Sequence, residues 1–549
     1  MHNLEKLLIQ RLAVSLKRKA ISNCSDWAEQ YRIMGEPFPG HYNFKHHPWC
    51  REIHDCNDQV IVNQKSAQMG LTETALNRVF FTIDILGRSV LYILPTGNPD
   101  CTDFSSSRFD PALELSPHLG NLFTEVKNVG HKRAGSASLF VRGSRSRSQL
   151  KSLPVGLIIF DEVDEMNQDN IILAAERTSG QREWQHFYLS TPTIDDYGIN
   201  LYYKDSTQDH FFFKCPSCSQ YIELLFPDNL VITSDDPNSQ EIKASHLKCN
   251  RCDAVLPHQD KTNFLAKGIY RPTFSDKDYR GFYINQLYSC TVPPYIIARN
   301  FLKAQLNPQD EQEFYNSKLG LTHVVEGAQV TDQDIQNCTG GHQKQQQRHH
   351  DNVFVTMGVD VGSDLHCEIV SWKRTNDDLD PNLAHEGKLI YEGKIKDFER
   401  LDEFMRQFNV AHCVVDAQPE RRKALEFAQR FSGHVNICYY PEGMKNREIS
   451  FHSSETYGIS VDRTSWLDVS LGRVRKNAIR FPINLSLEYR EHIKALTRIY
   501  ERDKNDNPIG RYVKGNRADH FAHARNYCEI ALYIAAGAPA CFDMDEKVF

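Results

Sequence analysis

Residues 60–81 read VIVNQKSAQMGLTETALNRVFF, and this stretch decides the fold of the first half of the chain. An apolar run, a short polar turn and a helical pattern of apolar residues follow one another, as in a phosphate-binding loop. Gly70 and Thr72 fit the second glycine and the hydroxyl of G-x-x-x-x-G-K-[ST], but Leu71 replaces the lysine and Lys65 replaces the first glycine. We expect Lys65 to supply the cation that nucleotide phosphates need. An ordinary strand, turn and helix is the alternative.

Two further strands end in polar residues. In the segment VGLIIFDEVDEM, at 155–166, the apolar run ends at Asp161 and Glu162. Two adjacent acids suit one carboxylate that contacts Mg²⁺ and one that polarises the attacking water. The segment YLSTPT ends in the hydroxyl residues Ser190, Thr191 and Thr193. Either strand end alone could be a simple cap. Short β-branched runs alternate with helical stretches here, so together the three strands predict a mainly parallel α/β sheet of the additional-strand P-loop ATPase type.

Four cysteines form two C-x₂-C pairs separated by 30 residues, namely Cys215, Cys218, Cys249 and Cys252. Two-residue spacing lets both sulfurs of a pair reach one ion, and four thiolates close a tetrahedral Zn²⁺ site without an open position. The gap exceeds the usual 15–20 residues. The pattern predicts a structural zinc knuckle with no catalytic role.

Length and charge limit the remaining choices. The 549 residues predict three to four domains, and no run of about 18 apolar residues suggests a membrane span. The net charge of -7 excludes an overall positive charge that would attract nucleic acid, so any DNA contact must use local basic patches. The Gln/His-rich stretch at 337–352 has the composition of a linker.

Beyond that stretch, three acids follow predicted strands or open a predicted helix. Asp360 follows VFVTMGV, Asp416 ends AHCVVD, and Asp519 precedes a helix after a hairpin. Three strands in close succession, then strand, helix and strand, is the order of a ribonuclease H-like domain, whose first and fourth strands are neighbours. Converging carboxylates can hold two Mg²⁺ or Mn²⁺ ions for phosphodiester cleavage. His520 and His523 are interpreted as helix-surface residues, with an accessory role beside the acids as the alternative.

Basic residues recur around these acids and suggest a groove that follows a phosphate backbone. They are Arg421, Arg422, Lys423, Arg473, Arg475, Lys476, Arg480, Arg511, Lys514 and Arg517. We expect a helical segment at 1–45, an ATPase domain at 46–336 with the zinc insert at about 205–270, the linker at 337–352 and a nuclease domain at 353–549.

In this order the motifs resemble the large terminase subunit of tailed bacteriophages, in its lambda-type branch, over roughly 35–535. HPWCREIHD is similar to that family's adenine-side segment, KSAQMGLTE to its deviant phosphate loop, and STPTIDDYGIN to its coupling motif. RGFYINQLYS is another family-like stretch. Gln68 stands where related loops often carry arginine, which leaves Arg145, Arg147, Arg177 and Arg182 as candidates for an arginine finger.

The resemblance implies a motor and nuclease that pumps double-stranded DNA into a procapsid and cuts concatemeric DNA. Its implied partners are a small terminase subunit, the portal and further copies in a ring, in the cytoplasm of an infected bacterium and not in the mature virion. The implied cofactors are ATP with Mg²⁺, structural Zn²⁺ and two nuclease metal ions. The implied ATPase residues are Lys65, Ser66, Gly70, Thr72 and Asp161 for nucleotide, Glu162 for catalysis, and Ser190 and Thr191 for coupling.

The implied nuclease residues are Asp360, Asp416 and Asp519, with Glu420 as an alternative to Asp416. Two other functions remain open at this point. A DNA helicase or repair translocase with a fused nuclease would share the ATPase motifs, although no helicase motif follows STPT. A zinc-ribbon DNA-binding scaffold with decayed catalytic sites would show no ATP turnover.

Overall fold

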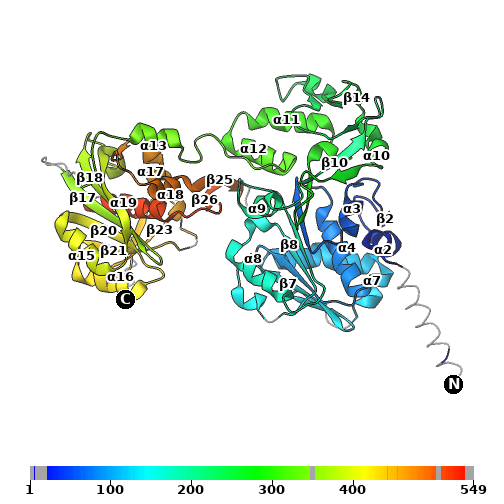
Figure 1. Ribbon diagram of the computed structural model, residues 1–549, viewed down its shortest axis with the longest axis horizontal. Coiled ribbons are helices and arrows are strands. Elements are labelled where there is room, and N and C mark those ends of the chain that lie inside the picture. The colour runs from blue at the N-terminus through cyan, green and yellow to red at the C-terminus, as the bar shows by residue number, and fades with distance from the viewer. Residues whose placement is uncertain are drawn as a thin grey trace, which may run out of the picture. The chain divides into compact units, whose positions relative to one another are not determined.

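The computed structural model describes Glu5 and residues 21–537, except for gaps at 125–126, 152, 346–352, 442, 445, 454 and 503–507. The chain divides into two compact units, Met1–His323 and Val324–Phe549 (Figure 1). Among the described helices, none combines the length and apolarity needed to cross a bilayer.

The first unit is built on a large sheet whose central strands are parallel. Its order is β11-β10-β16-β3-β9-β8-β4-β7-β6-β5, with β15 paired to β10. The parallel run comprises β10 (Asp209–Lys214), β16 (Arg280–Ile284), β3 (Val60–Lys65), β9 (Gln185–Ser190), β8 (Leu157–Asp161), β4 (Val90–Leu94) and β7 (Ala137–Gly143). Because β9 lies between β3 and β8, the predicted additional-strand ATPase fold is confirmed.

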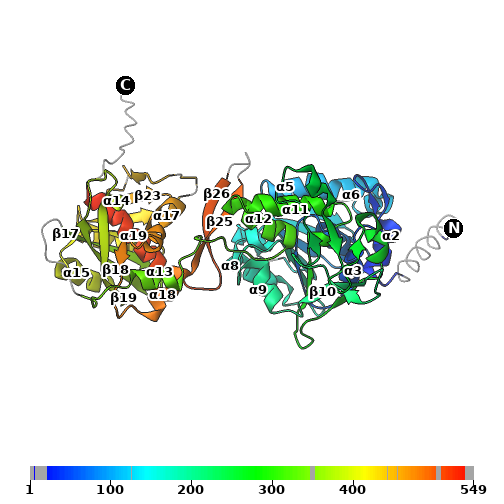
Figure 2. The ribbon, with the colours of Figure 1, turned by 90° about the horizontal axis from the view of Figure 1, so that it is seen from above.

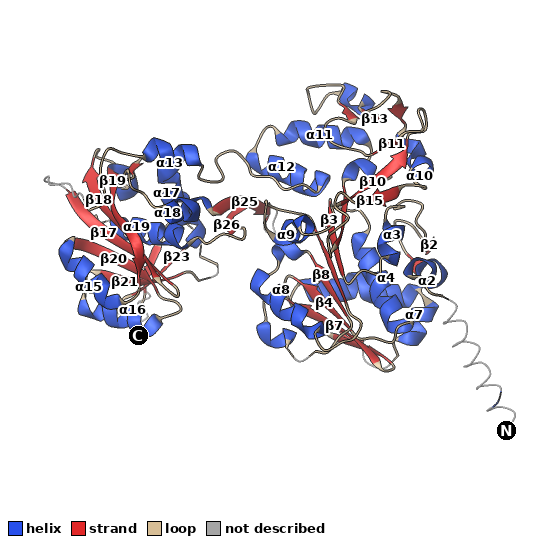
Figure 3. Ribbon diagram, in the orientation of Figure 1, coloured by secondary structure: helices blue, strands red, loops and turns tan. Residues whose placement is uncertain are grey.

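Helices cover both faces of this sheet (Figure 3). One core packs α4 (Leu71–Asp84) and α2 (Cys24–Tyr31) against one face, and a second packs α8 (Gln168–Ala175) and α9 (Gly198–Lys204) against the other. Buried side chains from successive residues of β3, such as Ile61 and Val62, enter opposite cores. This is why the strand is apolar without alternation.

Further elements of this unit lie outside the parallel run and outside the cysteine-containing insert. They are β1 (Ile33–Met34), β2 (Gly40–His41), α3 (Cys50–Asp55), α5 (Asp100–Phe104), α6 (Asp110–Leu115), α7 (Pro117–Leu122), β5 (Lys127–Asn128), β6 (His131–Ala134), α11 (Pro294–Ala304) and α12 (Pro308–Glu313). The expected helical segment at 1–45 is therefore wrong after Tyr31, where paired strands and loops follow, and residues 1–4 and 6–20 lie outside the described part.

The cysteine-containing insert extends the large sheet instead of standing apart from it. Strands β11 (Tyr221–Ile222) and β15 (Ile269–Arg271) pair with β10. A small sheet of β12 (Leu230–Val231), β13 (His246–Lys248) and β14 (Val255–Leu256), with α10 (Lys261–Phe264), completes it.

The second unit contains an eight-stranded sheet in the order β22-β23-β21-β20-β17-β18-β19-β24. Strands β17 (Val353–Val361), β18 (Leu365–Arg374) and β19 (His385–Ile395) are antiparallel, and β20 (Val410–Asp416) runs parallel to β17. The first and fourth strands are neighbours, so the predicted ribonuclease H-like fold is confirmed. The other strands of this sheet are β21 (Val435–Tyr439), β22 (Ile449–Phe451), β23 (Gly458–Val461) and β24 (Ile479–Arg480), whereas β25 (Leu496–Arg502) and β26 (Pro508–Lys514) form a separate antiparallel pair.

Helix α19 (His520–Ala535) lies against the middle of this sheet (Figure 2). It approaches β17 so closely that a Cβ on Gly358 would meet the carbonyl oxygen of Ala524 at 2.0 Å. Buried charges fix its register, since Arg525 pairs with Glu368 and Glu529, and Arg473 also pairs with Glu529. The other helices are α13 (Asp332–Cys338), α14 (Pro381–Ala384), α15 (Phe398–Gln407), α16 (Arg421–Arg430), α17 (Arg463–Arg475) and α18 (Leu487–Lys494).

The boundary between the units lies earlier than the linker expected at 337–352. The second unit begins at Val324, and α13 packs within it through buried Cys338. Gly340 N donates to Phe481 O at 2.8 Å, and His342 Nε2 lies 2.8 Å from Leu389 O. Residues 337–345 are thus part of the second unit, and 346–352 lie outside the described residues.

Candidate functional site

A cavity of about 830 Å³ lies at the carboxyl end of β3 in the first unit. Lys65, Gly70, Thr72, Glu162 and Thr191 line it. The other predicted ATPase residues, Ser66, Asp161 and Ser190, are buried and do not line it. The cavity lies outside the end of a parallel sheet, where open α/β folds bind ligands.

The phosphate loop has the backbone of an anion-binding turn. Gly70 adopts a φ of 82°, in the left-handed region that glycine enters at least cost, directly before α4. The first two loop amides are occupied elsewhere, because Ser66 N donates to Ile284 O and Ala67 N to Ser317 O. Anion binding therefore depends on the later amides and on the N-terminus of α4.

Glu162 faces the cation of this loop. Its Oε1 lies 3.3 Å from Lys65 Nζ, and its Oε2 accepts a hydrogen bond from Ser190 Oγ at 3.3 Å. Glu162 has a φ of 63°, which is unusual for a residue with a side chain and often marks a functional position. The structure thus brings together a residue from each of the three predicted strand ends.

Asp161 lies deeper, on the last residue of β8. Tyr92 donates a hydrogen bond to its Oδ2 at 2.5 Å. Burial and the neighbouring Glu162 charge raise the pKa of Asp161 to about 7. Among the described residues, neither its Oδ1 nor the Oγ of Ser66 has a hydrogen-bond partner. Two buried oxygens without partners fit a Mg²⁺ ion or its water shell beside the phosphates.

Asp164, which no sequence motif indicated, connects the acidic strand end to the loop of the coupling motif STPTIDDYGIN, residues 190–200, here called the coupling loop. It is 2 % exposed, and its carboxylate accepts hydrogen bonds from Thr193 N and Ile199 N, both at 2.7 Å. Its own N–H donates to Ser190 Oγ at 3.3 Å. The sequence signal was its place in DEVDEM, two residues after Glu162.

The wall opposite the loop comes from the segment after α2. The rings of Phe38 and His46 stack at 4.3 Å and line the cavity, as does Tyr42. Flat rings of this kind can hold a nucleobase. The adenine-side segment suggested by sequence, HPWCREIHD, starts one residue beyond His46, so most of this wall was missed.

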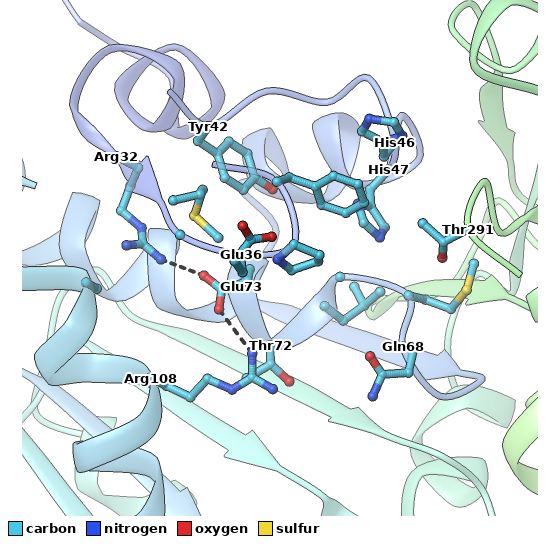
Figure 4. Close-up of a pocket in the computed structure, with 18 of the residues that line it drawn as sticks. Arg32, Glu36, Tyr42, His46, His47, Gln68, Thr72, Glu73, Arg108 and Thr291 are labelled. Carbon is cyan, nitrogen blue, oxygen red and sulfur yellow. Dashed lines mark hydrogen bonds and ion pairs between the residues drawn. The ribbon is translucent and has the colours of Figure 1, made fainter. Parts of the chain in front are cut away.

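The four arginine-finger candidates do not line the cavity in the described part of the chain, whereas two other arginines do. Arg32 and Arg108 reach Glu73 from two sides, at 2.5 Å and 3.5 Å (Figure 4). Arg32 is buried and also bonds Asn77, but the Arg108 side chain is 52 % exposed. Arg108 was missed because its helical context, SSSRFD, carries no motif.

A second site lies in the other unit, where β17, β20 and α19 bring three acids to one edge of the sheet. Asp360 is on β17, Asp416 ends β20, and Asp519 directly precedes α19. His520 Nδ1 lies 2.8 Å from Asp360 Oδ2, and His523 Nε2 lies 3.3 Å from Asp519 Oδ2. Both histidines of the first turn of α19 thus contact the acids, and the His520 side chain is still 40 % exposed at the helix surface.

The electrostatics of these acids differ. Burial and the Asp360 charge raise the pKa of Asp416 to about 6. Burial alone would raise the pKa of Asp519, but His523 and Lys514 hold it well below its ordinary value. The hydrogen bond that His520 makes with Asp360 raises the pKa of His520. Crowded carboxylates that share compensating cations fit a site for divalent metal ions.

Glu420, the alternative third acid, pairs with Lys423 at 3.1 Å and directly precedes α16. Of the basic residues expected to form a groove, Lys514 contacts the acids directly, with Nζ 2.9 Å from Asp519 Oδ1. Arg473 is buried in the ion pairs that hold α19, so its assignment to a surface groove is wrong.

The four predicted cysteines meet in the insert, with their sulfurs within 4.8 Å of one another. The two pairs have the same local geometry. Cys215 N donates to Gln220 O and Cys249 N donates to Ala254 O, each at 2.9 Å. The residues that close the two turns, Ser219 and Asp253, both have positive φ.

Two family models match the chain in succession. "Phage terminase large subunit gpA, ATPase domain" matches residues 36–270, and "Terminase large subunit gpA, endonuclease domain" matches residues 279–379. Together they span more than half of the chain, and the second reaches Asp360. No curated protein matches this sequence.

Several solved structures of phage large terminases are similar to this chain. The large terminase of bacteriophage HK97 is 10 % identical over 93 % of this chain and 99 % of its own, with a TM-score of 0.47. A large terminase from a thermophilic bacteriophage is 11 % identical over 87 % and 94 %, with a TM-score of 0.31. The nuclease of thermophilic phage G20c, with bound magnesium, is 11 % identical over 36 % and 94 %, with a TM-score of 0.24.

Proposed function

Because the chain belongs to the gpA family of phage terminase large subunits, we propose that its two sites divide the work of that enzyme. The chain is an ATPase and a metal-dependent endonuclease of viral DNA packaging. The cavity at Lys65 and Glu162 is the ATPase site, and the acids at Asp360, Asp416 and Asp519 form the nuclease site.

In the ATPase site, Lys65 and the N-terminus of α4 bind the phosphates of ATP. Asp161 would hold Mg²⁺, with Ser66 and Thr72 beside it, and a bound Mg²⁺ would neutralise charge on the phosphates. Glu162 orients the attacking water and accepts its proton. Ser190 transmits a change in the position of Glu162 to the coupling loop. Asp164 holds that loop in place. The hydrogen bond from Ser190 to Glu162 supports this path.

In the nuclease site, Asp360, Asp416 and Asp519 would hold two Mg²⁺ or Mn²⁺ ions, which would neutralise charge that develops during phosphodiester cleavage. Lys514 compensates the charge of Asp519 and contacts the DNA phosphate near the cut. His520 orients Asp360 through its hydrogen bond.

The cysteine cluster holds structural Zn²⁺, because four converging sulfurs leave no open position for a substrate. The partners are double-stranded DNA, a small terminase subunit, the procapsid portal and further copies of the chain in a ring. The site of action is the cytoplasm of the infected bacterium, and the chain does not stay in the mature virion.

The contact between Lys65 and Glu162 carries the ATPase assignment. We expect double-stranded DNA to stimulate ATP hydrolysis, and metal ions without ATP to support cutting of a supercoiled plasmid. A helicase would instead separate strands in a displacement assay, and a decayed scaffold would turn over no ATP.

A further inference from the structure

A second group of possible metal ligands lies beside the three nuclease acids and shares His366 with a group that contains Asp360 and His520. Ligand atoms of His366, Glu488 and His492 lie within 4.8 Å of one another. These residues come from β18 and from α18, whereas Asp416 and Asp519 belong to other elements. The proposed nuclease reaction makes no use of them.

His366 is the unusual member of this group. It is 4 % exposed, and among the described residues neither of its ring nitrogens has a hydrogen-bond partner. It lies opposite Asp360 in the pairing of β17 with β18, among the rings of His520, Phe521 and His492. A buried polar ring without a partner is rare and indicates a missing ligand or water.

Glu488 and His492 are positioned to bind the same ligand as His366. They lie four residues apart on α18 and therefore on one face of the helix. His492 is 6 % exposed, and its Nε2 lies 3.9 Å from Glu488 Oε1. The helix is held by Ser486, whose Oγ accepts a hydrogen bond from Tyr489 N at 3.1 Å.

We propose that His366, Glu488 and His492 bind a divalent transition-metal ion, which is distinct from the metal ions of the nuclease acids and from the zinc of the cysteine cluster. Two imidazoles and one carboxylate suit ions of the series from Mn²⁺ to Zn²⁺. Mg²⁺ favours oxygen ligands and retains several waters, so it does not compete well here.

Binding requires only local adjustments. Two ligands at about 2.1 Å from one ion are at most about 4.2 Å apart, and the ligand atoms here already lie within 4.8 Å of one another. Lys394, which pairs with Glu488, must share that carboxylate with the ion. Phe521 N donates to His492 Nδ1 at 3.4 Å, a long contact that is lost when Nε2 takes the metal and Nδ1 keeps the proton.

A bound ion would connect two secondary-structure elements that are far apart in sequence. The ion links β18 to α18, and the Phe521 contact places the site at the first turn of α19, next to Asp519. We therefore assign the ion a structural role, in which it holds α18 against β18, the strand that pairs with the Asp360 strand.

Co²⁺ titration of the full-length protein tests this site. The cysteine cluster is first filled with Zn²⁺, and a large excess of Mg²⁺ occupies the oxygen-only sites. We expect calorimetry and the visible absorption of Co²⁺ to show one ion per chain that the excess of Mg²⁺ does not displace. Glu488→Gln and His492→Ala should each weaken this binding at least tenfold.

Asp416→Asn and His434→Ala, which alter a nuclease acid and an exposed histidine of the same unit, should keep the Co²⁺ site intact. The proposal is wrong if the wild-type protein binds no such ion, or if Glu488→Gln and His492→Ala bind it as tightly as the wild type does. Glu488 is partly exposed, so its conservative variant keeps the fold and the test remains decisive. Plasmid cutting is measured separately, so loss of Co²⁺ binding and failure of the nuclease assignment are distinguishable.

Discussion

Lys65 Nζ lies 3.3 Å from Glu162 Oε1, so the cation at the start of the phosphate loop faces the carboxylate at the end of the neighbouring acidic strand. A lysine at the usual position, now Leu71, is not needed to bring a positive charge to this point. The Lys65 side chain is 7 % exposed, so solvent screens its attraction to Glu162 and to a bound phosphate only weakly.

We predict different defects for the two members of this pair. Lys65→Ala removes a phosphate contact and should weaken both ATP binding and turnover. Glu162→Gln keeps the shape of the side chain but cannot accept a proton, so ATP should bind normally while hydrolysis falls by about 10²–10⁴-fold. Nucleotide-binding titrations and phosphate release measure the two effects.

Lys303→Ala is the matched control, because Lys303 is exposed on α11 and does not line the cavity. Wild-type turnover in Lys65→Ala would remove the deviant-loop interpretation.

Arg108 is predicted to be the arginine that the first unit itself supplies to the phosphates. Its side chain is half exposed in the cavity wall and its contact with Glu73 is long, at 3.5 Å, so it is able to turn toward a ligand. Arg108→Ala should lower ATP turnover at least tenfold, with little change in ATP binding. Arg182→Ala, at an exposed position outside the cavity, is the comparison. Equal turnover in both variants would exclude Arg108.

The ATPase residues that sequence predicted are those that stand at strand ends. In a parallel sheet these ends meet at one edge, so β3, β8 and β9 place Lys65, Glu162 and Ser190 together once their order is known. The cavity wall at Phe38 and Arg108 could not be predicted, because it depends on how α2, α6 and their loops pack over that edge. The local sequence does not specify how these elements pack against one another.

The linker expected at 337–352 shows a similar limit. Its polar composition is typical of a loop, but Cys338 and His342 are buried against α17 and β19. A nuclease fragment should therefore begin at Val324, because one that begins near 350 would expose the surface that α13 covers.

The cysteine cluster is predicted to bind about one Zn²⁺ per chain, as elemental analysis would show. Structural zinc contributes on the order of 10 kcal/mol to the folding of small domains. Cys249→Ser should therefore release zinc and make residues 205–270 sensitive to protease. Cys56→Ser, at a partly buried cysteine outside the cluster, should retain both zinc and resistance. Stable wild-type protein without metal would contradict the assignment.

Metal binding by the nuclease site should depend on pH through Asp416. Its pKa of about 6 lies above the ordinary value, and a metal ion binds only the ionised carboxylate. The apparent affinity for Mn²⁺ should therefore fall about tenfold per pH unit below pH 6 and level off above it. Calorimetric titration from pH 5 to pH 8 measures this dependence. Asp416→Asn should bind Mn²⁺ weakly at every pH, and an unchanged profile in that variant would assign the dependence to another group.

We propose that ATP hydrolysis and DNA cutting occur at separate sites on two sheets of one chain. The most direct measurement assays both activities in the same preparations of Glu162→Gln, Asp360→Asn and Asp519→Asn proteins, with supercoiled plasmid as the DNA. We predict that Glu162→Gln loses DNA-stimulated ATP turnover but nicks the plasmid with Mn²⁺, whereas Asp360→Asn and Asp519→Asn keep ATP turnover and lose nicking. Nicking at the wild-type rate by both Asp360→Asn and Asp519→Asn would contradict the account.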